Sequence, residues 1–364
     1  MNPLTNDAID YDLSAGRAPI PITVLTGFLG AGKTTLLTRI LNGNQGVRVA
    51  VLVNDFGSIN IDAELVVGVE SDVISLANGC VCCSIRDDLI EAVTQVIARP
   101  EQPEYVLLEA SGVADPSGIA VTFANPAFRD RIRLDSITCV LDAEQVFVAP
   151  ELMQLKLWQI GFADLLILNK VDLVGRDQIE RVKVWLDEHF HRYRLIKATH
   201  GGVPLEILLS SGRFDAARPE RKCGHPDERD CQDAHNEHPQ NDHTHAFSTW
   251  SYETDQPLSL EALRRVASRL PVNIYRCKGV IRSAEVPERR VVLQVVGKRV
   301  DISIDEEWGD RPPLTRIVAI GAYGAIDNEA LRGKFDSCLA QTCRLEPTGA
   351  ALWRDLVNHE INPF

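Results

Sequence analysis

A phosphate-binding loop and a cluster of three cysteines are the two stretches of this chain whose residue types and spacing could carry chemistry. The loop runs from Gly27 to Thr34 and fits the pattern GxxxxGK[ST] in full. Such a loop curls its backbone N–H groups around phosphate oxygens, and the helix that follows adds the positive end of its dipole. The pattern therefore predicts a nucleoside triphosphate site, against the simpler alternative of a glycine-rich turn that binds nothing.

Two side chains of this loop have separate expected roles. Lys33 should reach the β and γ phosphates, and the Thr34 hydroxyl should be a ligand of Mg²⁺. The residues that we expect to contact the nucleotide in this loop are Gly27, Gly30, Ala31, Gly32, Lys33, Thr34 and Thr35.

The cysteine cluster consists of Cys80, Cys82 and Cys83 and follows the turn-forming pair Asn78-Gly79. Zinc and cobalt(II) accept sulfur-rich tetrahedral shells, so three thiolates would leave one position for water or another ligand. Ser84 could cap a helix that begins directly after the cluster, and thiolate pKa values fall at helix N-termini. Inert core cysteines and a redox pair are the alternatives, although a disulfide between adjacent cysteines requires strained geometry.

A third motif indicates which base the nucleotide carries. Residues 163–168 form an apolar run typical of a buried parallel strand, and Asn169, Lys170 and Asp172 follow at its carboxyl end. This stretch resembles the guanine-reading NKxD motif of P-loop GTPases. A carboxylate at Asp172 can accept hydrogen bonds from the ring N–H and the exocyclic amine of guanine, a donor pair that adenine lacks. We therefore expect GTP to be preferred over ATP, with a helix-capping turn as the alternative reading.

Two further strand ends should complete the hydrolytic site. Residues 104–109 form an apolar strand ending in Glu109, which takes the place of the acidic residue that holds the Mg²⁺ shell. Gly112 could then present its N–H to the γ-phosphate. Another strand, Val49–Val53, leads toward Asp55, which we expect near Mg²⁺ or the attacking water in a segment that switches with the nucleotide, unless it is only an N-cap. Our candidate catalytic residues are Lys33, Asp55 and Glu109.

The elements that must position these motifs alternate between strand-like and helix-like runs from residue 20 to 212, which is the pattern of a parallel sheet. Residues 136–141 read as one more such strand, with Cys139 in the core. We predict an α/β fold, with a P-loop NTPase domain on a mostly parallel sheet followed by a smaller α+β C-terminal domain. The expected boundaries are a polar tail at 1–19, the P-loop GTPase domain at 20–212, a linker at 213–245, the C-terminal domain at 246–345 and a tail at 346–364.

The linker differs sharply from its neighbours in composition. Residues 218–245 are almost devoid of apolar side chains, which is typical of a flexible segment. Its imidazoles and thiols could capture zinc, cobalt or nickel weakly, with a solvated linker and incidental histidines as the alternative. These ligand-type residues are Cys223, His225, Cys231, His235, His238, His243 and His245.

The C-terminal part predicts a small α+β domain. Strands are expected at 247–252, 273–281 and 314–320, and a hairpin at 290–304 turns around Gly297-Lys298. Ser259 and Asp327 should begin two helices. This part shows no catalytic constellation, and its cysteines, Cys277, Cys338 and Cys343, read as core or incidental residues.

The composition argues against a membrane protein, a secreted protein and a nucleic-acid-binding protein. The 364 residues are 45% hydrophobic, enough for two cores, yet no apolar run reaches the ~18 residues of a membrane span. The first residues lack the features of a signal peptide, and nine cysteines, an odd number, indicate reduced thiols, so we expect a cytoplasmic protein. A net charge of -13 argues against nucleic acid as a partner.

Taken together and in this order, the motifs resemble the CobW-like family of P-loop GTPases, strongly over residues 20–212 and more loosely beyond. The resemblance implies a metallochaperone or metal-insertase GTPase for zinc, cobalt or iron, with relatives among cobalamin-synthesis proteins and nitrile hydratase activators. It also implies a base-contacting loop near 198–200 and a C-terminal domain that acts as a docking surface or lid. The segments that carry it are the phosphate loop and residues 53–57, 78–83, 109–116 and 169–172.

One mechanistic hypothesis unites the two chemical sites. Residues 55–83 connect the expected nucleotide switch to the thiol cluster, so GTP and Mg²⁺ could gather the sulfurs and hydrolysis could scatter them. The metal, Zn²⁺ or instead Co²⁺ or Fe²⁺, would pass to a client metalloprotein or metallocofactor enzyme, and a homo-oligomer is one option for the assembly. The rival hypotheses are a nucleotide-gated interaction protein with structural cysteines, and an ATP-dependent kinase or ATPase.

Overall fold

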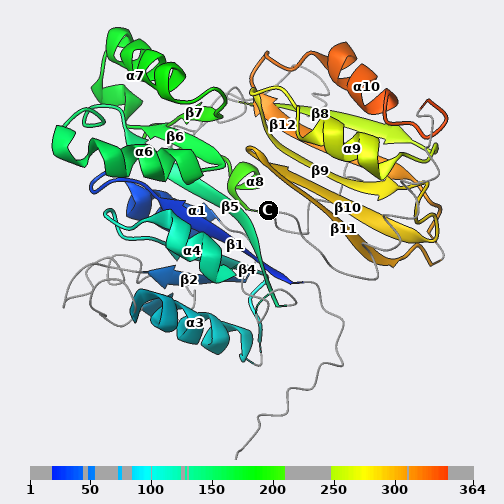
Figure 1. The fold of residues 1–364 in the computed structure, drawn as a ribbon, viewed down its shortest axis with the longest axis horizontal. Coiled ribbons are helices and arrows are strands. Elements are labelled where there is room, and N and C mark those ends of the chain that lie inside the picture. The colour runs from blue at the N-terminus through cyan, green and yellow to red at the C-terminus, as the bar shows by residue number, and fades with distance from the viewer. Residues whose placement is uncertain are drawn as a thin grey trace, which may run out of the picture.

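The computed structural model describes residues 19–43, 48–53, 73–75, 84–99, 101–123, 128, 131–209, 247–309 and 311–342. These residues form two β-sheets, one parallel and one antiparallel, with helices packed on both (Figure 1). The boundaries expected near residues 212, 245 and 345 lie outside the described residues, as do the linker and almost all of both tails. None of the described helices has the length and apolar character needed to cross a membrane.

The first sheet has seven strands in the order β3-β2-β4-β1-β5-β6-β7, and each pair of neighbours runs parallel. β1, which leads into the phosphate loop, lies near the centre between β4 and β5. The predicted parallel sheet is therefore confirmed. Its strands are β1 Ile20–Thr26, β2 Val49–Val53, β3 Val73–Ser75, β4 Tyr105–Glu109, β5 Ile132–Asp142, β6 Leu165–Asn169 and β7 Leu195–Lys197.

Helices cover both faces of this sheet, which explains why its strands are apolar at nearly every position. Successive side chains of a strand point to opposite faces, so Val24 of β1 packs toward α3 and α4 while Leu25 packs toward α1. One face carries α1 Lys33–Gly43 and α8 Leu205–Leu208, and the other carries α3 Ser84–Ile97, α4 Pro116–Phe123, α6 Met153–Phe162 and α7 Arg176–His189.

One strand is longer than predicted. β5 begins at Ile132, four residues before the apolar run expected at 136–141. The added part contains Arg133 and Asp135, whose charges break the apolar pattern. Both side chains are satisfied by partners from the other sheet, as described below, so the strand continues through them. Cys139 lies in the core as predicted, with a side chain that is fully buried.

The second sheet is antiparallel, with five strands in the order β11-β10-β9-β12-β8. Its core lies between this sheet and two helices, where the rings of Trp250, Tyr252 and Phe335 stack with centroids 5.5 to 5.9 Å apart. The predicted hairpin, the predicted N-cap Ser259 and the predicted helix start near Asp327 are confirmed, and Asp327 is the N-cap of that helix. The elements are β8 Phe247–Thr254, α9 Leu260–Ala267, β9 Ile274–Arg282, β10 Arg289–Val296, β11 Arg299–Glu307, β12 Thr315–Ala322 and α10 Asn328–Asp336.

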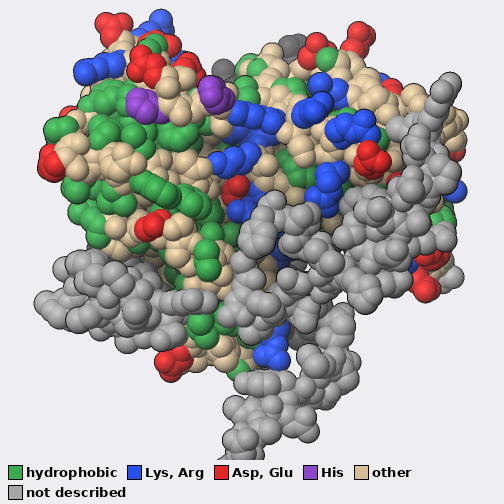
Figure 2. Space-filling model, viewed as in Figure 1, with side chains coloured by type: hydrophobic (Ala, Val, Ile, Leu, Met, Phe, Trp, Pro, Cys, Tyr) green, Lys and Arg blue, Asp and Glu red, His purple; other side chains and the backbone are tan. Residues whose placement is uncertain are grey.

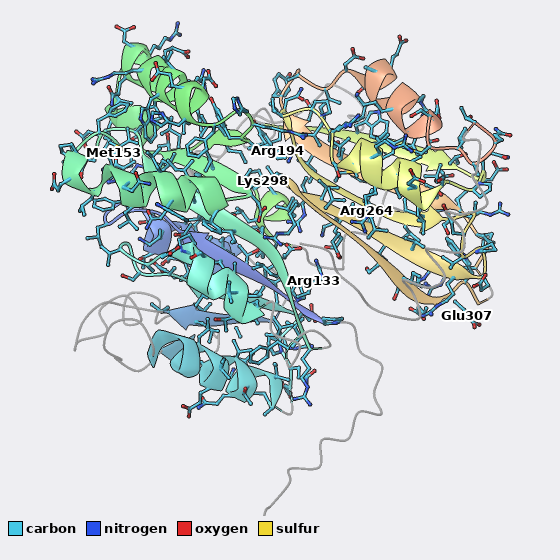
Figure 3. All side chains as sticks on the ribbon, viewed as in Figure 1. Arg133, Met153, Arg194, Arg264, Lys298 and Glu307 are labelled. Carbon is cyan, nitrogen blue, oxygen red and sulfur yellow. The ribbon has the colours of Figure 1, made fainter. Side chains whose placement is uncertain are left out.

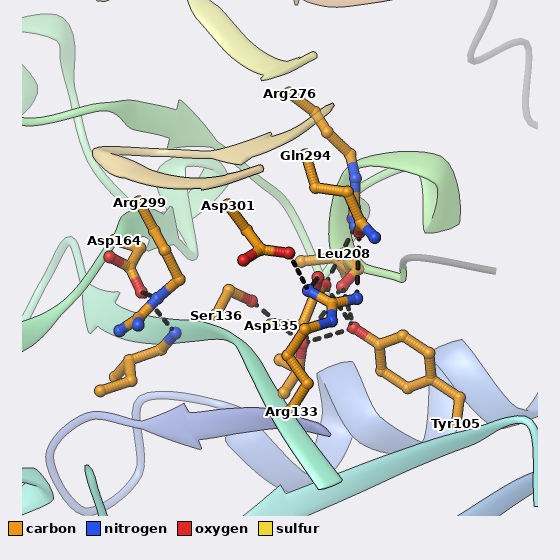
Figure 4. A network of polar contacts seen from close by, with 12 residues as sticks. Tyr105, Arg133, Asp135, Ser136, Asp164, Leu208, Arg276, Gln294, Arg299 and Asp301 are labelled. Atoms are coloured by element: carbon orange, nitrogen blue, oxygen red, sulfur yellow. Dashed lines mark hydrogen bonds and ion pairs between the residues drawn. The ribbon is translucent and has the colours of Figure 1, made fainter. Parts of the chain in front are cut away.

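A buried ion pair joins the two sheets. Arg276 of β9 donates to the Asp135 carboxylate at 3.0 Å (Figure 4). It also donates to the carbonyl oxygen of Ile207 at 2.8 Å. The hydroxyl of Tyr105 donates to the same carboxylate at 2.7 Å, and Arg133 lies 3.3 Å from its other oxygen. Arg276 and Asp135 are 1% and 2% exposed, so the charges are compensated inside the protein and not by solvent.

The turn between β10 and β11 makes a second contact between the sheets. A side chain at Gly297 would place its Cβ atom 1.6 Å from the carbonyl oxygen of Asp164, so only glycine allows this approach. Lys298 donates to the carbonyl oxygen of Gly161 at 2.6 Å, and Arg299 donates to the Asp164 carboxylate at 3.0 Å. Lys and Arg side chains gather along this junction in Figure 2, and Figure 3 labels Lys298 among them. The second sheet is thus fixed to the first by this turn as well as by the buried ion pair.

We expect Arg276→Met to lower the free energy of unfolding by about 3 kcal/mol, because the Asp135 carboxylate stays buried after one of its two cations is lost. The matched control is Arg316→Met, whose guanidinium pairs with Glu253 at 3.0 Å on the exposed surface of the same sheet. That change should cost less than about 1 kcal/mol. Urea unfolding followed by tryptophan fluorescence measures both, and equal losses would contradict the importance of the buried pair.

A second prediction concerns pH. Burial, together with the nearby positive charge of Arg276, lowers the pKa of Lys278 from 10.5 to about 7. Between these two values the unfolded chain holds a proton that the folded chain has lost, so the free energy of unfolding rises with pH, by at most about 1.4 kcal/mol per pH unit. Lys278→Met should remove this rise. Unfolding curves of both proteins at several pH values from 7 to 10.5 test it, and parallel pH profiles would refute it.

Candidate functional site

The register of the parallel strands brings the predicted site residues to one edge of the sheet. Leu25 of β1 pairs with Glu109 of β4, and Asp142 of β5 pairs with Asn169 of β6. All four lie at or next to the carboxyl ends of their strands. This edge is where open α/β sheets bind ligands, so we take it as the candidate site.

The phosphate loop connects β1 to α1 and depends on glycine backbone geometry. Gly27, Gly30 and Gly32 have φ angles of 129°, 72° and 98°, which side chains other than glycine rarely adopt. Gly27 also approaches β5 so closely that a Cβ atom would lie 2.1 Å from the carbonyl oxygen of Val140. The loop therefore presents an open backbone at the start of a helix, as phosphate binding requires.

Lys33 is the first residue of α1, and its side chain folds back over the loop. Its ammonium donates to the carbonyl oxygens of Gly27 at 3.0 Å and Phe28 at 3.4 Å, and the residue is 7% exposed. The positive charge is therefore held inside the loop. This position agrees with the predicted role of Lys33 at phosphate oxygens.

Thr34 and Glu109 meet at the start of α1. The Thr34 hydroxyl donates to Oε1 of Glu109 at 2.8 Å, and Glu109 is 3% exposed. Mg²⁺ prefers oxygen ligands and takes one or two carboxylates, with water and phosphate oxygens completing its shell. A hydroxyl and a carboxylate side by side beside a phosphate loop fit that preference. These two residues are therefore the candidate Mg²⁺ ligands.

Gly112 lies directly against the phosphate loop. A Cβ atom at this position would be 2.7 Å from the backbone nitrogen of Leu29, so a larger residue would push the two loops apart. The preceding Ala110 donates its N–H to the carbonyl oxygen of Leu25 at 2.9 Å. The segment after β4 is thereby anchored to β1 at the edge where we expect the γ-phosphate.

Asn169 ties the predicted base-reading segment to two other loops. Its amide nitrogen donates to the carbonyl oxygen of Ala31 at 3.0 Å, and its amide oxygen accepts from the N–H of Gly201 at 3.0 Å. Asn169 is 2% exposed. The loop after β7, where the family resemblance implies a further base-contacting loop at 198–200, is thus joined to the phosphate loop through one side chain.

The other two residues of this motif lie closer to solvent. Lys170 has a left-handed backbone with φ 60°, and its ammonium pairs with the Asp142 carboxylate at 2.7 Å. Asp172 lies in the short 3₁₀ turn Val171–Leu173 and is exposed. Its carboxylate can therefore accept hydrogen bonds from a ligand. Thr35, the last nucleotide residue expected in α1, is exposed as well.

Sequence reasoning missed three residues of this region. Asp142 is the partner of Lys170, and Lys156 and Gln159 of α6 are buried beside the phosphate loop and the Gly112 segment. A polar residue facing the core of a short apolar helix is the signal that could have indicated the latter two. Asp142 is recognisable as an acidic residue at a strand end, although its partner is not.

Asp55, Cys80, Cys82 and Cys83 lie outside the described residues, so their roles remain predictions. The described elements around the cluster are nevertheless informative. Ser75, the last residue of β3, pairs with Val53, which in turn pairs with Glu109. A helix directly after the cluster is confirmed, and α3 begins at Ser84 itself, the residue expected to cap it. The chain therefore leaves the sheet for the cysteine cluster at the edge that holds Glu109.

The buried cysteines elsewhere are core residues. Cys139, Cys277 and Cys338 are fully buried, and burial raises the pKa of the first two thiols to about 12, which makes them unreactive. Within the described ranges, no group of three or more His, Cys, Asp and Glu side chains could hold a metal ion. Cys343 lies outside the described residues.

Comparison with known proteins agrees with this arrangement. Residues 21–196 match the family described as CobW/HypB/UreG, nucleotide-binding domain, and residues 247–339 match the cobalamin synthesis protein cobW C-terminal domain. Two proteins named zinc chaperone CobW are similar to the chain. The one from a Sinorhizobium species is 30% identical, with 87% of this chain and 97% of that protein covered, and the one from Pseudomonas aeruginosa is 32% identical, with 89% and 92% covered.

A protein of Dictyostelium discoideum named zinc-regulated GTPase metalloprotein activator 1 is also similar. It is 29% identical over 328 residues, which cover 79% of this chain and 68% of that protein. Both sheets of the chain thus have counterparts in known families, in the order in which they occur here.

Proposed function

Because this chain belongs to the CobW family, we propose that it is a GTP-hydrolysing metallochaperone that binds zinc at Cys80, Cys82 and Cys83 and passes it to a client. Cobalt(II) and iron(II) remain candidate cargoes, because first-row ions share these ligands. The enzymatic activity is that of a GTPase, and similar proteins carry names that state a GTPase or a zinc chaperone. The proposal places the protein in the cytoplasm, where its thiols stay reduced.

The main support for the proposal is the short path from the phosphate loop to the start of the cysteine segment. The strand register connects Ser75 through Val53 to Glu109, and Glu109 contacts Thr34 of the phosphate loop. Neighbouring strands lie about 4.8 Å apart, so the departure point toward the cysteines is roughly 10 Å from the candidate Mg²⁺ ligand. A change in the shell around Glu109 can therefore reach the start of the cysteine segment across two strands.

The residues at the phosphate edge have distinct parts in GTP hydrolysis. The glycine backbone and Lys33 hold the phosphates, Gly112 offers its N–H to the γ-phosphate, and Asp55 orients the attacking water. When bound, Mg²⁺ neutralises charge on phosphate oxygens, and the Thr34 hydroxyl and the Glu109 carboxylate would hold it. Binding of the triphosphate would order the segment that carries the thiols. Loss of the γ-phosphate would release that segment and, with it, the bound metal ion.

The experiment is a zinc competition titration with a chelating indicator, in the presence of a non-hydrolysable GTP analogue, of GDP, or of no nucleotide. We expect about tenfold tighter zinc binding with the analogue, a coupling within the usual range. The triple variant Cys80→Ser, Cys82→Ser and Cys83→Ser should not bind zinc. The control variant Cys338→Ala, in the core of the second sheet, should bind zinc as the wild type does. Equal zinc affinity in the three nucleotide states would exclude the coupling.

The same variants separate the alternative function, a nucleotide-gated interaction protein with structural cysteines. Under the proposal, the triple serine variant loses zinc binding and keeps the melting temperature and the GTP affinity of the zinc-free wild type. Under the alternative, the serine changes unfold the protein. Circular dichroism during heating distinguishes the two.

Guanine selectivity gives a further prediction. Asp172→Asn should weaken GTP binding about a hundredfold, because the amide cannot accept both guanine N–H groups and leaves one donor unpaired. The same amide can accept from the ring N–H of xanthine and donate to its 2-oxo group, so XTP affinity should rise. Displacement of a fluorescent nucleotide measures GTP, XTP and ATP side by side. Stabilisation of the wild type by ATP and not by GTP would support the rival ATPase.

A further inference from the structure

Helix α6 carries two buried polar side chains at the nucleotide edge of the sheet. Lys156 is 3% exposed and Gln159 is 1% exposed, on a ten-residue helix that is otherwise mostly apolar. Polar groups removed from water are costly unless they find hydrogen-bond partners. Both side chains find theirs in loops at the nucleotide edge of the sheet.

Gln159 holds the segment that follows β4. Its amide nitrogen donates to the carbonyl oxygen of Gly112 at 3.1 Å and to that of Ala114 at 3.2 Å. The segment also contains a turn, in which the Ala114 N–H donates to the carbonyl oxygen of Ser111 at 3.0 Å. One side-chain amide therefore satisfies two carbonyl groups of a loop that lies outside regular secondary structure.

Lys156 binds to the neighbouring loops from the same helix. Its ammonium donates to the carbonyl oxygens of Val146, at 3.0 Å, and Val148. It also lies 4.5 Å above the ring centroid of Phe28 in the phosphate loop. α6 is thus in contact with the phosphate loop through Lys156 and with the Gly112 segment through Gln159.

The backbone around Gly112 has little freedom to move. Its Cα atom lies against Leu29 of the phosphate loop, Ala110 is fixed to β1, and Gln159 fixes the carbonyl groups of residues 112 and 114. The N–H of Gly112 lies between these anchors. Removing the amide of Gln159 would release one end of the segment while the other stays attached to the sheet.

We propose that Gln159 is a positioning residue that discriminates GTP from GDP, by holding the Gly112 segment where its N–H meets the γ-phosphate. This inference rests on the GTPase activity proposed above. GDP has no γ-phosphate, so its affinity does not depend on the position of this segment. In contrast, the affinity for GTP and the rate of its hydrolysis depend on the position of this segment.

The first test is Gln159→Met, which keeps the length of the side chain and removes both donated hydrogen bonds. We expect affinity for a non-hydrolysable GTP analogue to fall about tenfold, equivalent to about 1.4 kcal/mol, with GDP affinity unchanged and kcat reduced by a similar factor. The matched control is Gln178→Met on α7, because Gln178 also donates its amide to a backbone carbonyl, that of Ala143, at 3.1 Å. The control should change neither affinity.

The second test, Gln159→Glu, has a signature that a merely structural role does not produce. The introduced carboxylate would face two carbonyl oxygens in a buried site, which raises its pKa. Ionised, it repels the segment, and protonated, it donates one hydrogen bond again. The ratio of GTP-analogue affinity to GDP affinity in this variant, taken relative to the same ratio of the wild type at each pH, should therefore rise as the pH falls. This measurement requires that the variant stays folded across the pH range used, which circular dichroism checks at each pH.

The outcomes separate this inference from the proposed function. If the wild type binds neither GDP nor the analogue, the proposed function fails. If the wild type binds both, and Gln159→Met loses equal affinity for the two or loses none, Gln159 has no role in sensing the γ-phosphate and the inference is overturned. A Gln159→Glu variant whose affinity ratio, relative to that of the wild type, does not vary with pH overturns it as well.

Discussion

The candidate site depends on the parallel register of β4, β1, β5 and β6, because this register alone brings distant motifs to one edge. Glu109 lies beside the end of β1, and Asn169 lies beside Asp142 at the end of β5. The strands are buried on both faces, and a shift of one residue would turn every side chain to the opposite face. Apolar packing therefore fixes the register of the strands, and the register fixes the positions of the site residues.

The local parts of this arrangement were predictable from the sequence, and the distant contacts were not. Apolar runs, turn residues and N-caps identified the strands, the helix after the phosphate loop and the hairpin at Gly297, because these patterns lie within a few residues of each other. Family membership was also recognisable, since its motifs occur in a fixed order. The contacts of Asn169 with Ala31 and of Gln159 with Gly112 join residues far apart in the chain, and no local pattern names such partners.

The junction between the sheets also depends on contacts that local sequence patterns do not predict. Arg133 and Asp135 interrupt an apolar strand pattern, and taken alone they indicate that the strand starts later than it does. Their charges become compatible with the interior only when Arg276 is brought in from 141 residues away. Asp164 follows the same rule. Burial raises its pKa, while the charge of Arg299 and the N–H of Ile137 oppose that rise.

The sharing of one core by both sheets has a practical consequence for anyone who wishes to dissect the chain. Tyr275 and Ile320 of the antiparallel sheet belong to the same buried cluster as the apolar residues of α1 and β1. An expression fragment that stops at residue 196, where the match to the nucleotide-binding family ends, would also discard Ile207 and Leu208 of α8, which fill that cluster. The truncated surface would be apolar, and Asp135 would lose its buried partner Arg276. The apolar core beneath the phosphate loop is therefore completed by residues that follow the last nucleotide motif.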